Sequence, residues 1–375
     1  MRAFARAILL CALLVLLPTG RVAGAEVDTS PTHWAFAWTS TVPFYGTVMA
    51  SDAGGTVVAG FHGAIVAVDV SGAQQWAAQI DLDEVVNRPA LVEDVVVVPS
   101  RHGTVALSRA TGVQLWASAL KRARVVAGTA SGRPVVLATT PDGVLRSLDP
   151  VTGAELMQRA LPAPTPDGAP LLEGNGERAI VAWGTEGDCC TIAAFDAADG
   201  SLEWKRVVSE HSTVPLTHGQ IVVVGVSPSM GERGRIVAFD AATGEPRWRT
   251  AVESRFENGL HGAGAERLVV LASRDGSVIA ADTLTGDVLW QSEAVIAADQ
   301  AHPMITERQV FLTPHSTDLV AFDRATGAVV SGGPIEQTIV VTDTDVVDGH
   351  FQLLVTNGFE GQIWNLEPGG LRTDR

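Results

Sequence analysis

The chain has 375 residues, of which 46% are hydrophobic, and its formal net charge is −16. The only lysines are Lys121 and Lys205, so there is no basic stripe, and an acidic surface repels phosphate backbones. These features exclude nucleic acid as a partner. The length would ordinarily indicate two domains unless the fold is built from repeats.

The N-terminal residues have the pattern of an export signal. Arg2 and Arg6 precede an apolar run over residues 8–17, and the small residues AGA follow at 23–25. This is the order of a secretory signal peptide. The apolar run is about half of the roughly 20 residues that a membrane helix needs, so a membrane anchor is the weaker alternative. We predict a signal peptide at 1–25 and a single mature domain at 26–375, outside the cytoplasm and without a transmembrane segment.

A short motif recurs along the rest of the chain: apolar residues, a turn with a Gly, and in most copies a Trp four residues later. The copies are AVDVSGAQQW (67–76), ALSRATGVQLW (106–116), SLDPVTGAELM (147–157), AFDAADGSLEW (194–204), AFDAATGEPRW (238–248), AADTLTGDVLW (280–290), AFDRATGAVVS (321–331) and the truncated NLEPGG (365–370). Successive glycines lie 40–47 residues apart, the length of one four-stranded propeller blade.

One copy shows the expected local structure. Residues 213–217 and 221–226 read as two strands, and residues 235–239 read as a third that is apolar on both faces. Asp240 can then bond to nearby backbone, while Gly244 can adopt a positive φ. A Trp on the outermost strand would bury its ring against the turn of the adjacent blade. We predict this structural role for Trp38, Trp76, Trp116, Trp204, Trp248 and Trp290.

The two ends of the chain are complementary. The last repeat ends near Gly370 without a fourth strand, whereas HWAFAWTSTVP (33–43) resembles a fourth strand with no strands before it. The N-terminal strand should therefore complete the final blade. We predict an all-β, eight-bladed propeller of four-stranded antiparallel blades, with seven blades as the alternative.

The pattern A-x-D-x-x-T-G-x-x-x-W resembles the repeat of the PQQ-like (pyrroloquinoline-quinone-type) β-propellers, from residue 34 to about 370. That superfamily includes quinoprotein dehydrogenases, which hold the quinone and a calcium ion on the propeller axis. It also includes non-enzymatic eight-bladed members, such as the lipoprotein propeller of the outer-membrane barrel-assembly machinery. The resemblance therefore leaves both an enzyme and a scaffold open.

Strand alternation places the turns between second and third strands on the same face as the connections between blades. We expect a ligand on this face. The candidates in the turns are His62, His102, Asp142, Cys189, Arg233, Asp275, Ser316 and Glu360, and those in the connections are Asn87, Arg88, His211, Glu257, Asn258, Asp299 and His302. The alternative is that they are ordinary polar turn residues.

Cys189 and Cys190 are the only cysteines after the predicted signal peptide. A bond between them would be strained, because adjacent Cα atoms lie about 3.8 Å apart and disulfides usually span at least about 4.4 Å. On a strand, the two side chains would point to opposite faces and could not pair. A vicinal disulfide is nevertheless one alternative, because alcohol-oxidising quinoproteins stack such a bond on the quinone.

Other sequence features do not supply a reaction centre. DTDVVDGH (343–350) lacks the spacing of an EF-hand calcium loop, so we interpret it as a hairpin with its turn at Asp348-Gly349. The histidines have no metal-ligand spacing, and no Glu/Asn/Asp calcium set or catalytic Asp matches the dehydrogenase pattern. We interpret Trp183 and Trp364 as strand core.

The leading hypothesis is an exported, non-enzymatic and monomeric propeller that binds an envelope or extracellular protein or polymer, with no cofactor. The alternatives are a PQQ- and calcium-dependent dehydrogenase of alcohols or sugars, and a sensor of a small ligand. Because fold alone does not fix function, all three remain open at this stage.

Overall fold

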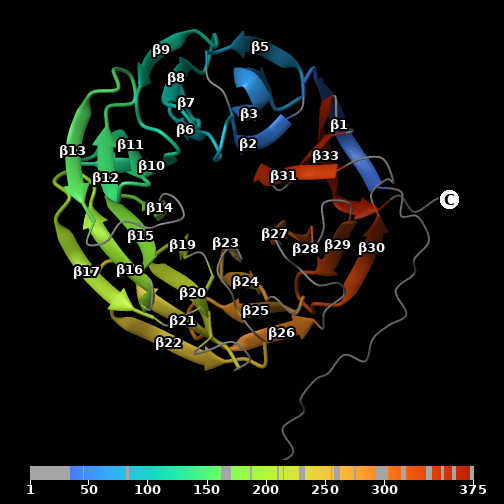
Figure 1. Cartoon of the computed structure of the whole chain (residues 1–375). Helices are drawn as coiled ribbons and strands as arrows, with labels where there is room; N and C mark the ends of the chain where they lie inside the picture. The colour runs from blue at the N-terminus through green and yellow to red at the C-terminus, as the bar shows by residue number, and fades with distance from the viewer. Residues whose placement is uncertain are drawn as a thin grey trace, which may run out of the picture.

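Eight antiparallel sheets form a ring in the computed structural model (Figure 1). The structure describes residues 34–44, 46–81, 84–161, 170–185, 188–208, 211–213, 215–227, 233–254, 256, 262–273, 276–292, 303–313, 318–334, 340–347, 350–356 and 360–371. The predicted signal peptide and its cleavage site lie outside these residues. No helix in the described part of the chain has the length and apolar character that a membrane span needs.

Each blade runs from an innermost to an outermost strand. Blade 1 contains β2 (Gly46–Asp52), β3 (Gly55–Gly60), β4 (Ala64–Val68) and β5 (Gln74–Gln79), and blade 2 contains β6 (Ala90–Val92), β7 (Val95–Pro99), β8 (Thr104–Ser108) and β9 (Gln114–Ser118). Blade 3 contains β10 (Arg124–Ala130), β11 (Arg133–Thr140), β12 (Val144–Leu148) and β13 (Glu155–Ala160), and blade 4 contains β14 (Leu171–Asn175), β15 (Arg178–Thr185), β16 (Asp188–Asp196) and β17 (Leu202–Val207). A single 3-10 turn, η1 (Phe61–Gly63), separates β3 from β4.

Blade 5 differs from the others because two short strands form its inner edge. Blade 5 contains β18 (His211–Ser212), β19 (Leu216–His218), β20 (Ile221–Ser227), β21 (Arg235–Asp240) and β22 (Pro246–Ala251), and blade 6 contains β23 (Gly262–Ala265), β24 (Leu268–Ala272), β25 (Val278–Asp282) and β26 (Val288–Ser292). Blade 7 contains β27 (Met304–Ile305), β28 (Gln309–Leu312), β29 (Asp318–Asp323) and β30 (Val329–Pro334), and blade 8 contains β31 (Val340–Val347), β32 (His350–Thr356), β33 (Gly361–Leu371) and β1 (Trp34–Val42). The inner strand predicted at 213–217 is thus replaced by β18 and β19.

The N-terminal strand closes the ring, as predicted. β1 pairs antiparallel with β33, and Trp38 lies opposite Asn365 in the register. The count of eight blades is confirmed, and the seven-bladed alternative is not needed. The hairpin predicted around 348–349 is also present, because Val347 pairs with His350 between β31 and β32, although the two turn residues lie outside the described part.

The core lies between blades, where the middle strands of neighbouring sheets face each other. Every residue of β7, β20 and β24 is buried, as expected for strands covered on both faces. The outermost strands are different: in β9 and β26, Trp116 and Trp290 are the only buried residues.

The repeated tryptophans join six of the eight blades to the next blade. Each indole lies over the turn glycine of the following blade, and its Nε1 donates to a backbone carbonyl of that turn at 2.6–2.9 Å. The pairs are Trp38 with Gly72, Trp76 with Gly112, Trp116 with Gly153, Trp204 with Gly244, Trp248 with Gly286, and Trp290 with Gly327. In blade 3, Met157 takes this place, with its Sδ against Gly200. The six tryptophans thus pack against the turn of the neighbouring blade.

The turn chemistry explains why the motif needs Asp and Gly. Asp240 accepts the N–H groups of Ala242 and Thr243 at 3.0 and 2.8 Å, and Gly244 adopts φ 66°. A hydrogen bond from Arg247, followed by the one from the Thr243 N–H, lowers the pKa of Asp240 to about 2. The carboxylate therefore stays charged over the physiological range and keeps the turn in place.

Candidate functional site

The turns between second and third strands lie on the same face as the connections between blades, and we call this the connection face. Arg122, in the β9–β10 connection, donates its N–H to the Ser100 carbonyl in the β7–β8 turn at 2.8 Å. Likewise, Arg101 donates its N–H to the Glu84 carbonyl of the preceding connection at 2.9 Å. The two kinds of loop therefore form one continuous surface.

Five predicted candidates are exposed on turns of this face: His62, His102, Asp142, Arg233 and Glu360. Each of the five lies in the turn of a different blade. Arg233 pairs with Glu253 at 2.9 Å, and Asp142 lies 3.8 Å from Arg146. Two of the five are thus engaged with charged neighbours of their own blades, and the role of these candidates as ligand residues stays a prediction.

The remaining candidates are described less fully. Asp275, Asn258 and His302, together with Ser316, Glu257 and Asp299, lie outside the described residues. Two placements differ from the prediction: Cys189 and Cys190 lie inside β16, which begins at Asp188, and His211 lies in β18 and not in a loop. β16 begins before Cys189 because Asp188 already pairs with Thr185 of β15. The vicinal disulfide stays a prediction.

The inner wall, made by the innermost strands of the blades, carries a cluster of charged residues that the sequence did not single out. It consists of Arg124 on β10, Glu173 on β14, Asp343 and Asp345 on β31, and Arg88 in the β5–β6 connection. Only Arg88 was a predicted candidate. The sequence signal for Asp343 and Asp345 was DTD, since alternate residues of a strand share one face, whereas Arg124 and Glu173 had no such signal.

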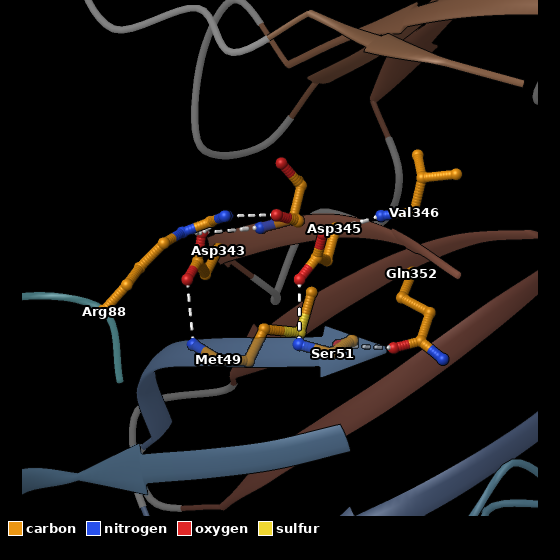
Figure 2. A network of polar contacts seen from close by, with 8 residues as sticks. Met49, Ser51, Arg88, Asp343, Asp345, Val346 and Gln352 are labelled. Atoms are coloured by element: carbon orange, nitrogen blue, oxygen red, sulfur yellow. Dashed lines mark hydrogen bonds and ion pairs between the residues drawn. The ribbon is translucent and has the colours of Figure 1, made fainter. Parts of the chain in front are cut away.

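The two aspartates tie blade 8 to blade 1 (Figure 2). Asp343 Oδ2 accepts the Met49 N–H at 2.8 Å, and Asp345 Oδ2 accepts the Ser51 N–H at 3.0 Å. The guanidinium of Arg88 forms an ion pair with Asp343 and donates to the Thr344 carbonyl. We call these contacts the closure network, because they join blade 8 to blade 1, where the ring closes.

A second layer of side chains supports the same seam. The buried Gln352 on β32 accepts a hydrogen bond from Ser51 Oγ at 3.1 Å (Figure 2). It also accepts one from Thr56 Oγ1 at 2.7 Å. The seam between the two ends of the chain is thus held by side chains as well as by the pairing of β1 with β33.

Burial changes the protonation of this wall. It raises the pKa of Glu173 to about 7, although Arg88 and Arg124 oppose the shift through their positive charges. Burial also raises the pKa of Asp345, against the opposing charge of Arg88. The inner wall therefore contains a carboxyl group that titrates near neutral pH.

Two carboxylates of the inner wall are already engaged by other groups of the protein. Asp343 and Asp345 already accept backbone N–H groups, and Asp343 also pairs with Arg88. Within the described ranges, no group of three or more His, Cys, Asp or Glu side chains could hold a metal ion. Asp343 and Asp345 serve the closure network.

Two hollows lie away from the axis. The first, of about 400 Å³, is on the connection face between blades 2 and 3, and its lining includes Leu120, Lys121, Arg122, Asp142 and Arg146. We call it the blade 2–3 pocket. The second, of about 230 Å³, lies at the seam of the ring and is lined by Ala37, Trp38, Gly55, Val70, His350, Gln352 and Asn365.

Sequence comparison identifies one family. The family model described as outer membrane protein assembly factor BamB matches residues 18–229 and 191–363. No curated protein matches the sequence significantly.

Solved structures share the fold at low sequence identity. BamB from Moraxella catarrhalis is 16% identical, with a TM-score of 0.65 over 84% of this chain and 95% of that one. The computationally designed Ika8 protein is 17% identical, with a TM-score of 0.65 over 89% and 100%. The quinohemoprotein alcohol dehydrogenase ADHIIG from Pseudomonas putida HK5 is 13% identical, with a TM-score of 0.62 over 93% and 78%. These similarities show the fold and do not choose between scaffold and enzyme. The family model covers most of the ring, and the chain therefore belongs to the PQQ-like β-propeller family described as outer membrane protein assembly factor BamB.

Proposed function

We propose that this protein is an exported, non-enzymatic propeller that binds a protein of the cell envelope through its connection face. The match to the family described as an outer membrane protein assembly factor carries the proposal. A rigid ring that presents variable loops is suited to binding a partner, because loops can change without disturbing the blades that hold them.

The structural role of the charged residues in the inner wall supports a scaffold function. In the inner wall, Arg88, Asp343 and Asp345 hold one blade to another, so their charges serve the rigidity of the ring. The connection face also presents exposed polar residues, among them His102 and Glu360. A partner would thus meet a firm surface whose polar groups need little reordering.

Site-specific photo-crosslinking in cells tests this proposal. A photo-reactive residue at His102 or Glu360, on the connection face, should crosslink to a protein that mass spectrometry identifies. The matched control is Ser131, in the β10–β11 turn on the opposite face, which should give no such product. Equal crosslinking from both faces, or none from either, would overturn the proposal. A crosslink to a polysaccharide would favour the polymer-binding form of the hypothesis.

A thermal melt tests the competing functions. Pyrroloquinoline quinone with calcium should leave the melting temperature unchanged, and so should a panel of sugars and alcohols. A ligand at a hundred times its Kd would add about 2.7 kcal/mol of stability, which a melt detects readily. A shift with the quinone would favour a dehydrogenase, and a shift with a sugar or alcohol would favour a sensor.

Export is part of the proposal and rests on the N-terminal pattern of two arginines, an apolar run and small residues. Cell fractionation should find the protein outside the cytoplasm, with Glu26 as its N-terminal residue. Light scattering should give the mass of a monomer. A cytoplasmic protein that retains Met1 would contradict this part of the proposal.

A further inference from the structure

We propose that the blade 2–3 pocket binds a carboxylate-bearing side chain of an acidic peptide segment in the partner protein. This inference rests on the proposed function and names the chemistry of the partner at one place. The pocket, of about 400 Å³, has the apolar residues Ala119, Leu120 and Pro141 in its lining, beside Lys121, Arg122 and Arg146. An apolar surface next to cations fits a short side chain that ends in a carboxylate.

Two of the cations are available to a ligand. Lys121 and Arg122 are exposed, and neither forms an ion pair with another described residue. The chain as a whole has a net charge of −16 and only two lysines, one of which is Lys121. The pocket is therefore a local positive site on an acidic molecule, where an acidic segment would be attracted and correctly oriented.

The third cation is held in a fixed position. The side chain of Arg146, 12% exposed, donates to Thr140 Oγ1 at 2.7 Å and to Glu155 at 3.2 Å. Asp142 lies 3.8 Å from it on the pocket's edge and is 62% exposed. Arg146 thus supplies a positive charge in a fixed position, which Glu155 partly neutralises. The negative charge of Asp142 repels a carboxylate that enters the pocket.

The connection that carries the free cations is anchored at both ends. Thr104 Oγ1 donates to the Leu120 carbonyl at 2.8 Å, and the Arg122 N–H donates to the Ser100 carbonyl at 2.8 Å. Arg122 also adopts φ 51°, a left-handed conformation that few residues other than Gly occupy. These contacts fix the backbone that presents Lys121 and Arg122, which lowers the entropy lost on binding.

The surroundings favour a peptide over a broad anionic surface. Beside the pocket, Arg101 pairs with Glu84 at 3.4 Å, so the positive charge does not extend across blade 2. A membrane or a long polyanion needs an extended basic surface, and the acidic chain would repel it. A small concave site with two free cations instead suits one or two acidic side chains.

Fluorescence anisotropy on the purified protein tests the proposal. The probe is a fluorescein-labelled short peptide of alternating Glu and Leu, compared with its Gln counterpart at about 0.15 M salt, where distant charges are screened. The Glu peptide should bind more tightly, and Lys121→Gln with Arg122→Gln should weaken its binding at least about fivefold, as expected for losing two partly exposed charge pairs. Asp142→Asn should strengthen binding, because it removes a like charge from the edge.

The matched control replaces the same amount of charge elsewhere. Arg133→Gln with Arg249→Gln removes two exposed cations away from the pocket and should change the affinity by less than about twofold, the scale of a screened distant charge. Equal effects of the two double variants, equal binding of the Glu and Gln peptides, or no effect of Asp142→Asn would overturn the proposal. Anionic phosphatidylglycerol vesicles that bind through Lys121 and Arg122 more tightly than the Glu peptide would also overturn it.

The result can be separated from that of the proposed function. If His102 still crosslinks to its partner in the Lys121→Gln with Arg122→Gln variant, with unchanged yield, the scaffold function stands and the carboxylate pocket is wrong. If no partner is captured at any connection-face position, the proposed scaffold function is wrong, regardless of the affinity measured for the Glu peptide.

Discussion

Replacing Trp116 by Ala should destabilise the protein by about 4 kcal/mol. The indole of Trp116 is 8% exposed, lies over Gly153 of the next blade and donates to the Pro150 carbonyl at 2.8 Å. Burial of some 150–250 Å² at about 25 cal/mol per Å² corresponds to roughly 4–6 kcal/mol, and aromatic-to-Ala changes in cores cost about 3–5 kcal/mol. The hydrogen bond contributes about 1 kcal/mol of that loss.

The chain itself supplies the matched control. Met157 fills the equivalent place in blade 3 and is 7% exposed, so Trp116→Met should cost only about half as much as Trp116→Ala. Gly153→Ala tests the other side of the contact. At Gly153, φ is 70° and an added Cβ would lie 2.7 Å from the indole, so Ala should cost more than about 1 kcal/mol.

Urea denaturation followed by circular dichroism and by tryptophan fluorescence measures these differences. Coincident transitions are required first, because repeat proteins can unfold in parts. If Trp116→Ala costs less than about 1 kcal/mol, or as little as Trp116→Met, the indole does not hold the blades together and the reasoning is refuted.

Three further predictions concern the closure network, the inner wall and the cysteines. Asp343→Ala removes the partner of Arg88 and the acceptor of the Met49 N–H, and should destabilise the protein by about 2–3 kcal/mol in urea. Asp343→Asn keeps a hydrogen-bond acceptor and should lower the stability by about half as much. An equal loss of stability in the two variants would contradict the hydrogen bond assigned between Asp343 and the Met49 N–H. Because the folded pKa of Glu173 is about 7 and its ordinary value is 4.5, the folded state holds more protons between these values. Stability from this group is therefore present at low pH and is lost as the pH rises toward 7. Glu173→Gln should lose less stability than the parent between pH 5 and pH 8, and an unchanged pH profile would refute the shift. If Cys189 and Cys190 form a vicinal disulfide, the alternative left open by the sequence, maleimide should label the denatured protein only after reduction; labelling without a reductant would disprove it.

The repeat made most of the fold predictable. Asp240 and Gly244 can be interpreted locally, because an Asx turn and a positive φ depend on residues only a few positions apart. The spacing of the motif then counts the blades, and Trp38 without preceding strands implies the closure by β1. The inner edge of blade 5 was missed, because two- and three-residue strands such as β18 and β19 carry too few residues for an alternation pattern.

The candidate site was predictable only in part. The sequence determined which residues occupy turns, since His62, His102, Asp142, Arg233 and Glu360 each adjoin a strand pattern. It did not determine that Asp343 and Asp345 would meet the backbone of Met49 and Ser51, almost 300 positions earlier in the chain. Nor could it show Glu173 between Arg88 and Arg124, or Lys121 beside Arg146 in one pocket. Local chemistry is set by neighbours along the chain, whereas burial, pKa shifts and pockets depend on which blades the closed ring brings together.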